Sequence, residues 1–156
     1  MQQKKEIRSS LCNCVNLRRA AHAVTAAYDK ALEPSGVKIS QFSILKYIRG
    51  MSPVSVSDLA KTMRLDRTTL VRNLKPLEAS GLVEDSAPEG GRSRRLALTD
   101  KGTKTLAQAD ALWKQAQLSL EEYLGKAELD TLRALLLKLE SIEARPENTA
   151  DGSIRL

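Results

Sequence analysis

Two short apolar segments, each with its own helix-capping residues, lie close together in the middle of the chain. The first follows Pro53, where Ser55 and Asp58 have the spacing of a capping box. The second follows Asp66, a favourable N-cap residue, and carries leucines at helical spacing as far as Gly81, which favours a helix end. Because each predicted helix is bounded on both sides, we expect two short helices joined by a tight turn.

The spacing of apolar residues changes directly after these helices. Leu82-Val83 is expected to begin a strand, residues 88–91 have the composition of a turn, and Leu96 and Leu98 alternate with other residues on the return strand. Arginines occupy the tip and the return strand of this predicted β-hairpin: Arg92, Arg94 and Arg95. Two short helices followed by such a hairpin predict a winged helix-turn-helix.

Longer helices are predicted on both sides of this unit. Apolar residues recur at helical spacing over about residues 9–33 and again over about 103–144, where Gly125 separates two helices. Between them, Ser40 is expected to cap a further helix. Aromatic residues make up only 3% of the chain, which favours packed helices over a β-sandwich. The expected fold class is therefore mainly α with a small β-wing.

The chain is basic, with a formal net charge of +6, and much of that charge lies near the second short helix. From Lys61 to Lys75 there are five cations and one anion, a net charge of +4. A helix that begins at Asp66 can enter a major groove with its N-terminus first. Arginine can pair with guanine edges, asparagine with adenine, and threonine hydroxyls can bind phosphates. The residues expected to contact double-stranded DNA are Arg67, Thr68, Thr69, Arg72, Asn73 and Lys75 on the helix, and Arg92, Arg94 and Arg95 on the hairpin.

Several other classes of protein find no support in the sequence. It has no glycine-rich phosphate loop and no cluster of metal ligands at fixed spacing, so we expect no enzyme activity, no cofactor and no metal site. Arg18 and Arg19 interrupt any apolar core of a secretory signal, and no apolar run reaches the length of a membrane span. We therefore expect a cytoplasmic protein, outside the membrane, whose two cysteines are reduced thiols.

Residues 55–102, SVSDLAKTMRLDRTTLVRNLKPLEASGLVEDSAPEGGRSRRLALTDKG, closely resemble regulators of the multiple antibiotic resistance (MarR) family. The most specific parts are LDRTTLVRNLKPLEASGLV and LALTDKG. The resemblance implies a homodimer whose first and last helices interlock, and a repressor that binds a pseudo-palindromic operator with half-sites one helical turn apart. The wing departs from the family pattern, because Gly90 stands where an aspartate often precedes the arginine that matches Arg92.

The flanking helices match the family layout too, so that the resemblance covers nearly the whole chain. We expect one winged helix-turn-helix domain over residues 1–144. Within it, a DNA-binding lobe is expected over about 37–100 and dimerisation helices over about 9–33 and 103–144. Residues 145–156 have the composition of a flexible tail.

A small-molecule effector pocket is expected where the first, second and fifth helices meet the DNA-binding lobe. Its candidate lining residues are His22, Tyr28 and Phe42.

Cys14 suggests an alternative means of regulation. Residues 14–28, CVNLRRAAHAVTAAY, align without gaps with the first helix of organic hydroperoxide sensors, a branch of the same family whose peroxide-reactive cysteine falls on Cys14. The tyrosines that orient the sulfur in those sensors match Arg18, Ile39 and Phe42, which lack the phenolic hydroxyl. Cys14 is therefore interpreted either as an oxidation sensor or as a small buried apolar residue. A helical scaffold that binds another protein through its apolar stripes, and no DNA, is a further alternative.

Overall fold

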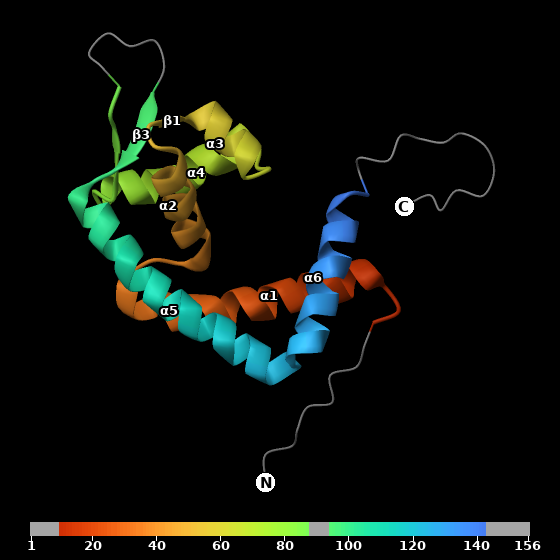
Figure 1. The fold of residues 1–156 in the computed structure, drawn as a ribbon. Coiled ribbons are helices and arrows are strands. Elements are labelled where there is room, and N and C mark those ends of the chain that lie inside the picture. Colours follow the sequence, from red (N-terminus) through yellow and green to blue (C-terminus); the bar gives the residue numbers. More distant parts are fainter. Residues whose placement is uncertain (1–9, 88–93, 143–156) are drawn as a thin grey trace, which may run out of the picture. The chain divides into compact units, whose positions relative to one another are not determined.

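The computed structural model describes residues 10–87 and 94–142. These residues form helices with a small sheet, as the sequence predicts (Figure 1). The helices are α1 (Asn13–Leu32), the short 3-10 helix η1 (Glu33–Ser35), α2 (Ile39–Met51), α3 (Val56–Thr62), α4 (Arg67–Ala79), α5 (Asp100–Leu124) and α6 (Lys126–Glu140), and the strands are β1 (Val54–Ser55), β2 (Val83–Asp85) and β3 (Arg95–Leu98).

The chain divides into two units, Met1–Ala116 and Gln117–Leu156, with the boundary inside α5. The first unit contains α1 to α4, the sheet and most of α5, and the second contains the end of α5 and all of α6. Gly125, with a φ of 92°, separates α5 from α6 as predicted. Within the described residues, no helix combines the length and the apolar character needed to cross a membrane.

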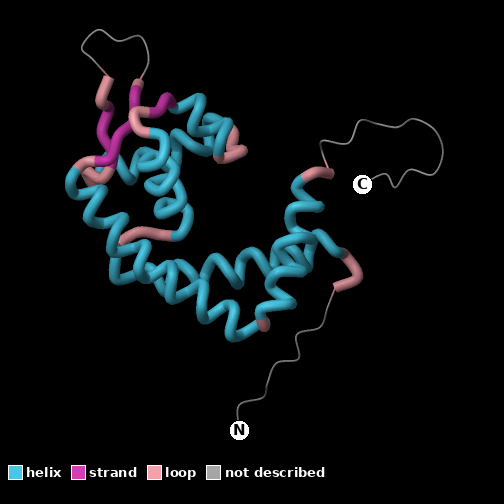
Figure 2. The backbone as a smooth tube through the Cα atoms, viewed as in Figure 1, coloured by secondary structure: helices cyan, strands magenta, loops and turns pink. Residues whose placement is uncertain are grey.

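The sheet has three antiparallel strands in the order β1-β3-β2 (Figure 2). Strands β2 and β3 confirm the predicted hairpin, and Val83 pairs with Leu98 across it. The predicted turn over residues 88–91 lies outside the described residues. Strand β1, in which Val54 pairs with Leu96, is not predicted by the sequence analysis. It has only two residues, too few for an alternating pattern to be visible.

The predicted caps of the two short helices are confirmed. Ser55 Oγ accepts a hydrogen bond from the backbone N–H of Asp58 at 3.0 Å, at the start of α3. Asp66 Oδ1 accepts one from the N–H of Thr69 at 2.8 Å, at the start of α4. Gly81, with a φ of 68°, follows the end of α4 in the left-handed conformation that glycine adopts readily.

The predicted cap of α2 is wrong. Ser40 lies inside the helix, which begins at Ile39 with Lys38 as its N-cap residue. Two side chains satisfy the first backbone donors instead. Gln41 Oε1 accepts from Lys38 N–H at 2.9 Å, and the carboxylate of Asp29, on α1, accepts from Ile39 N–H at 2.8 Å. Because Asp29 is ten residues away in the chain, this cap depends on the packing of α1 near α2, which local sequence patterns do not report.

A single apolar core holds the first unit together. It joins residues from α1, α2, α3, α4, the sheet and α5. Its most completely buried side chains are Phe42, Leu32, Ile44, Leu45, Ile48, Leu59, Leu70, Leu74, Leu77, Leu96 and Leu106. Three of these leucines come from α4, so burial fixes which face of that helix points inward and which faces solvent.

The second unit buries little of its own apolar surface. Leu129 is the buried residue among those described between 117 and 142. Six other large apolar side chains of α6 and the residues after it are exposed: Leu132, Leu135, Leu136, Leu137, Leu139 and Ile142. A helix with such an exposed stripe is expected to pack against a partner in solution.

Candidate nucleic-acid interface

Helix α4 presents a basic face opposite its buried leucines. Arg67, Thr68, Arg72 and Lys75 are exposed, while Thr69 and Asn73 are half-buried. A hollow of about 390 Å³ lies on this face, lined by Arg67, Thr68, Val71, Arg72 and Lys75. The structure thus brings three predicted cations together around one surface depression on the helix. Such a face can present guanidinium and ammonium groups to base edges and phosphates.

The N-terminus of α4 is held by a compact set of hydrogen bonds. Thr69 donates to Asp66 from both its backbone N–H and its hydroxyl, so part of its polar capacity is used in the cap. These bonds hold the pKa of the Asp66 carboxyl below its ordinary value, the side-chain bond contributing most. Arg67 Nη1 donates to Ser57 Oγ on α3 at 3.3 Å, which links the two helices.

The turn between α3 and α4 contains a basic residue in an unusual conformation. Arg64 has a φ of 52°, in the left-handed region where glycine or asparagine is more common. Its side chain is exposed, as is that of Lys61 at the end of α3. Both belong to the basic run identified in the sequence, so the positive charge extends from α4 into the turn.

The stem of the wing is closed by Asp85, at the end of β2. Its Oδ1 accepts hydrogen bonds from the backbone N–H groups of Arg95 at 2.9 Å and Ala87 at 3.0 Å. These bonds lower the pKa of the Asp85 carboxyl, with the bond from Arg95 contributing most. The N–H of Ser86 also donates to the carbonyl oxygen of Arg95 at 2.6 Å.

The three predicted wing arginines have different placements. Arg95 is exposed at the start of β3. Arg94 directs its guanidinium to two carboxylates, Glu78 on α4 and Asp85 on β2. Arg92, together with the unusual Gly90, lies outside the described residues. The sequence analysis did not identify Glu78 and Asp85 as partners of Arg94, because nothing in the local pattern pairs residues 16 and 9 positions apart.

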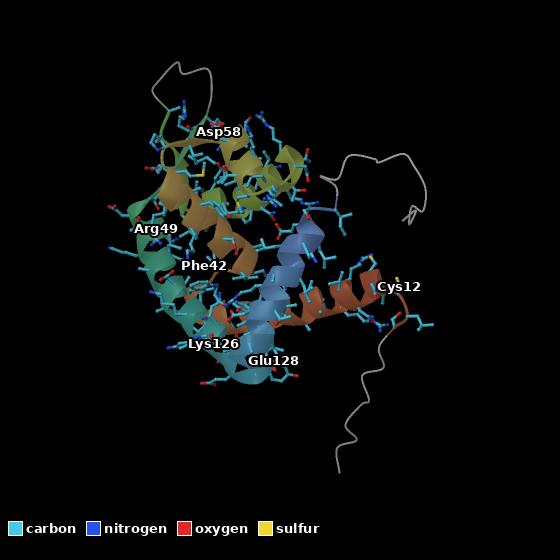
Figure 3. All side chains as sticks on the ribbon, turned by 45° about the vertical axis from the view of Figure 1, so that its right-hand side comes forward. Cys12, Phe42, Arg49, Asp58, Lys126 and Glu128 are labelled. Atoms are coloured by element: carbon cyan, nitrogen blue, oxygen red, sulfur yellow. The ribbon has the colours of Figure 1, made fainter. Side chains whose placement is uncertain are left out.

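A largely apolar cavity of about 490 Å³, open to solvent, lies against α2 in the first unit. It is lined by Phe42, Ser43, Lys46, Tyr47, Gly50, Met51, Thr62 and Trp113. Of the three residues predicted to line an effector pocket, Phe42 is in this set. Figure 3 labels its side chain on α2. Tyr28 is buried in the core and His22 is exposed on α1, and neither lines this cavity.

A lysine and two aromatic rings shape the cavity wall. The Nζ of Lys46 lies 4.2 Å from the ring centroid of Trp113 and 5.4 Å from that of Phe42, within the range of a cation–π interaction. The ring centroids of Phe42 and Trp113 are 5.8 Å apart. Asp110 lies 3.5 Å from Lys46 and 2.9 Å from Lys114, and its pKa is lowered mainly by Lys114 and then by Lys46. Lys46 follows Phe42 by four residues on the same helix. This spacing could have predicted, from the sequence alone, that the two side chains lie side by side.

Both cysteines lie at the start of α1 and are exposed in the single chain (Figure 3 labels Cys12). Cys12 is the N-cap residue of α1, and Cys14 belongs to its first turn. The interpretation of Cys14 as a small buried apolar residue therefore does not hold within one chain. No group of three or more metal-binding side chains is found in residues 10–87 and 94–142.

Comparison with known proteins identifies relatives of this fold and site. A model of the MarR family matches residues 35–93. The transcriptional regulator MosR from M. tuberculosis, in complex with DNA, is 37% identical, with a TM-score of 0.74 over 85% of this chain and 97% of that one. The transcriptional repressor CouR bound to a 23-mer DNA duplex is 30% identical, with a TM-score of 0.74 over 83% and 92% of the two chains. CouR bound to p-coumaroyl-CoA is 27% identical, with a TM-score of 0.76 over 84% and 93%.

These matches extend well beyond the winged helix-turn-helix to most of each relative. They agree with the mainly helical fold and the small antiparallel sheet of the described residues. The chain belongs to the MarR family of DNA-binding transcription regulators.

Proposed function

We propose that this protein represses transcription as a homodimer that binds a pseudo-palindromic operator. In this proposal α4 of each protomer enters a major groove, and the two half-sites are one helical turn apart. The main support is the basic outer face of α4, where Arg67, Arg72 and Lys75 surround one hollow. The relatives MosR and CouR were solved in complex with DNA, which also favours this use of the fold.

The proposed contacts divide between base edges and the backbone. Arg72 and Asn73, in the middle of α4, are proposed to contact base edges, since arginine pairs with guanine and asparagine with adenine. Arg67, Thr68 and Lys75 are proposed to position the helix on the phosphates, and Arg92 and Arg95 to extend the contact through the wing. Thr69 is also predicted to contact a phosphate, but both of its donors are directed to Asp66, so this contact would require it to leave the cap. Arg94 is also predicted to contact a phosphate, although two of its five N–H donors are directed to carboxylates.

Selection of bound fragments from genomic DNA, followed by footprinting, tests the proposal. We expect enrichment of a short inverted repeat and two protected patches whose centres are about 10 base pairs apart. Enrichment without any sequence preference would contradict a sequence-specific regulator. Failure to retain duplex DNA at low salt would favour the helical protein-binding scaffold instead.

The exposed stripe on α6 supports the homodimer. All residues from 130 to 142 are exposed in the single chain, although the segment carries six large apolar side chains. Leu17 and Val24 on α1 are also exposed. A second copy of the chain could cover these surfaces, and a two-fold dimer would present two copies of α4 to a palindrome.

The cavity on α2 is proposed as the site of a small effector molecule that weakens operator binding. Its wall offers two aromatic rings, together with the ammonium group of Lys46 as a polar contact. A volume of about 490 Å³ suits a small organic ligand. The structure of the relative CouR with p-coumaroyl-CoA shows that a protein of this family can bind an organic molecule.

Trp113 gives a direct probe of this proposal, because it is the only tryptophan in the chain. Small organic molecules that release the protein from its operator should change the fluorescence of Trp113 at the same concentrations. A ligand that releases the operator with no change in this fluorescence, and with equal potency against Ser43→Phe, would place the effector elsewhere.

A further inference from the structure

The guanidinium of Arg94 joins the wing to the C-terminal end of α4. Its Nη2 donates to Oε1 of Glu78, and its Nε donates to Oδ2 of Asp85 at 3.2 Å. Glu78 is the penultimate residue of α4, and Asp85 is the last residue of β2. One side chain thus links the predicted DNA-reading helix, the outgoing strand of the wing and the start of the return strand.

Asp85 is itself fixed in place, which gives the link a rigid base. While its Oδ2 accepts from Arg94, its Oδ1 accepts from the backbone N–H groups of Arg95 and Ala87. The wing stem has only three residue pairs between β2 and β3, and so short a ribbon needs tertiary contacts to hold its direction. Pairing of β1 with β3 supplies one such contact, and the Glu78–Arg94 ion pair supplies another.

The charges around Arg94 do not suit a phosphate contact. The single positive charge of Arg94 faces two carboxylates, so the three side chains together carry a net charge of −1. The bond to Glu78 is the main reason that the pKa of Arg94 is raised, the direction expected for a guanidinium beside carboxylates. Nε and one N–H of Nη2 donate to these carboxylates, so a phosphate bound to the remaining N–H groups would place three anions around one guanidinium.

We propose that Arg94 is a positioning residue, which fixes the angle between the wing stem and α4 through Glu78 and Asp85 and does not bind DNA itself. This inference rests on the proposed function, because it concerns how α4 and the wing reach one operator together. The fork of the guanidinium is essential to the role, since a lysine ammonium cannot present two donors in the same planar arrangement.

The proposal predicts that removal of the Glu78 carboxylate changes operator affinity in the direction opposite to that expected from electrostatic repulsion by DNA. Electrostatic repulsion alone predicts that Glu78→Gln should strengthen DNA binding, because it removes a negative charge. If Glu78 acts by holding Arg94, the same substitution should instead weaken operator binding. We expect a loss of up to about 5-fold, the upper end of what an exposed ion pair contributes. Binding to random duplex should change less, because it depends less on a fixed wing.

Glu84→Gln is the matched control. Glu84 is an exposed carboxylate on β2, next to Asp85, and its removal changes the net charge of the protein by the same amount. We expect Glu84→Gln to leave operator affinity unchanged or slightly raised. Thermal unfolding of each variant, compared with the native protein, establishes that affinities are measured on folded protein.

Salt dependence and conservative substitution separate positioning from phosphate binding. Arg94→Lys should lose operator affinity as Arg94→Gln does, while the slope of log affinity against log salt stays the same in both. The double variant Glu78→Gln/Arg94→Gln should bind no more weakly than Arg94→Gln, because the two residues act through one contact.

The experiment measures operator and random-duplex affinity of these variants by fluorescence anisotropy over a range of salt concentrations. The proposal is overturned if Glu78→Gln binds the operator as tightly as Glu84→Gln does. It is also overturned if Arg94→Lys keeps native affinity while Arg94→Gln flattens the salt slope by about 1, as loss of a phosphate contact does. If the native protein bound no duplex, the proposed function would fail as well.

Discussion

Gly102 and Leu82 approach each other so closely that no side chain fits between them. A Cβ at Gly102 would lie 2.0 Å from the carbonyl oxygen of Leu82, which is backbone and cannot swing aside. Gly102 is in the first turn of α5, and Leu82 immediately precedes β2. The contact therefore fixes the start of α5 against the base of the wing.

Gly102→Ala is expected to destabilise the protein. The added methyl group must push α5 away from the wing base, and overpacking of this kind costs about 1–3 kcal/mol. Thermal or urea-induced unfolding measures the change. Gly50→Ala is the control, because Gly50 lies in α2 with nothing within 4 Å of its Cβ position. That substitution should stabilise by roughly 0.5–1 kcal/mol, since alanine favours a helix over glycine. Equal stability of both variants would contradict the close contact.

The exposed stripe on α6 leads to a prediction about oligomeric state. Leu136→Glu should shift sedimentation from a mass near twice 17.2 kDa toward that of one chain, because a charge replaces an apolar contact. Ala134→Glu adds the same charge two residues away, about 200° around the helix axis. It should leave the dimer intact. A native protein that sediments as a monomer at micromolar concentration would refute the dimer.

Oxidation is expected to have little effect on DNA binding. The residues that match the sensor tyrosines are Arg18, Ile39 and Phe42, so no phenolic hydroxyl from those positions can orient the sulfur of Cys14. Operator binding is measured before and after treatment with an organic hydroperoxide, for the native protein, Cys14→Ser and Cys12→Ser. Loss of binding that Cys14→Ser abolishes and Cys12→Ser does not would instead identify Cys14 as the sensor.

Local sequence patterns predicted the parts of the fold that depend on near neighbours. The side chains of Ser55 and Asp66 accept hydrogen bonds from backbone N–H groups three residues ahead of them, and the leucines of α4 define its buried face by their spacing. The reversal at Gly81 follows from glycine's access to the left-handed conformation. These features set the order of the helices and the outward direction of the basic face, which is why the predicted DNA-binding residues of α4 are mostly exposed.

Features that depend on distant residues were missed. The cap of α2 uses Asp29 of α1, and strand β1 exists only because Val54 can pair with Leu96. The two carboxylates that hold Arg94 come from different elements, so the sequence does not identify them as its partners. The cavity likewise combines α2 with Trp113, and that pairing requires the packing of α5 beside α2.

Arg72 provides the most direct test of the central claim, that the outer face of α4 reads DNA sequence. Affinity of the native protein, Arg72→Ala and Arg49→Ala is measured for a selected operator and for random duplex of equal length. Arg49 is an exposed arginine on α2, so its removal changes the net charge equally (Figure 3). We expect Arg72→Ala to cost about 1–3 kcal/mol on the operator and much less on random duplex, and Arg49→Ala to change neither. Equal weakening of operator and random duplex by Arg72→Ala would contradict the assignment of α4 as the recognition helix.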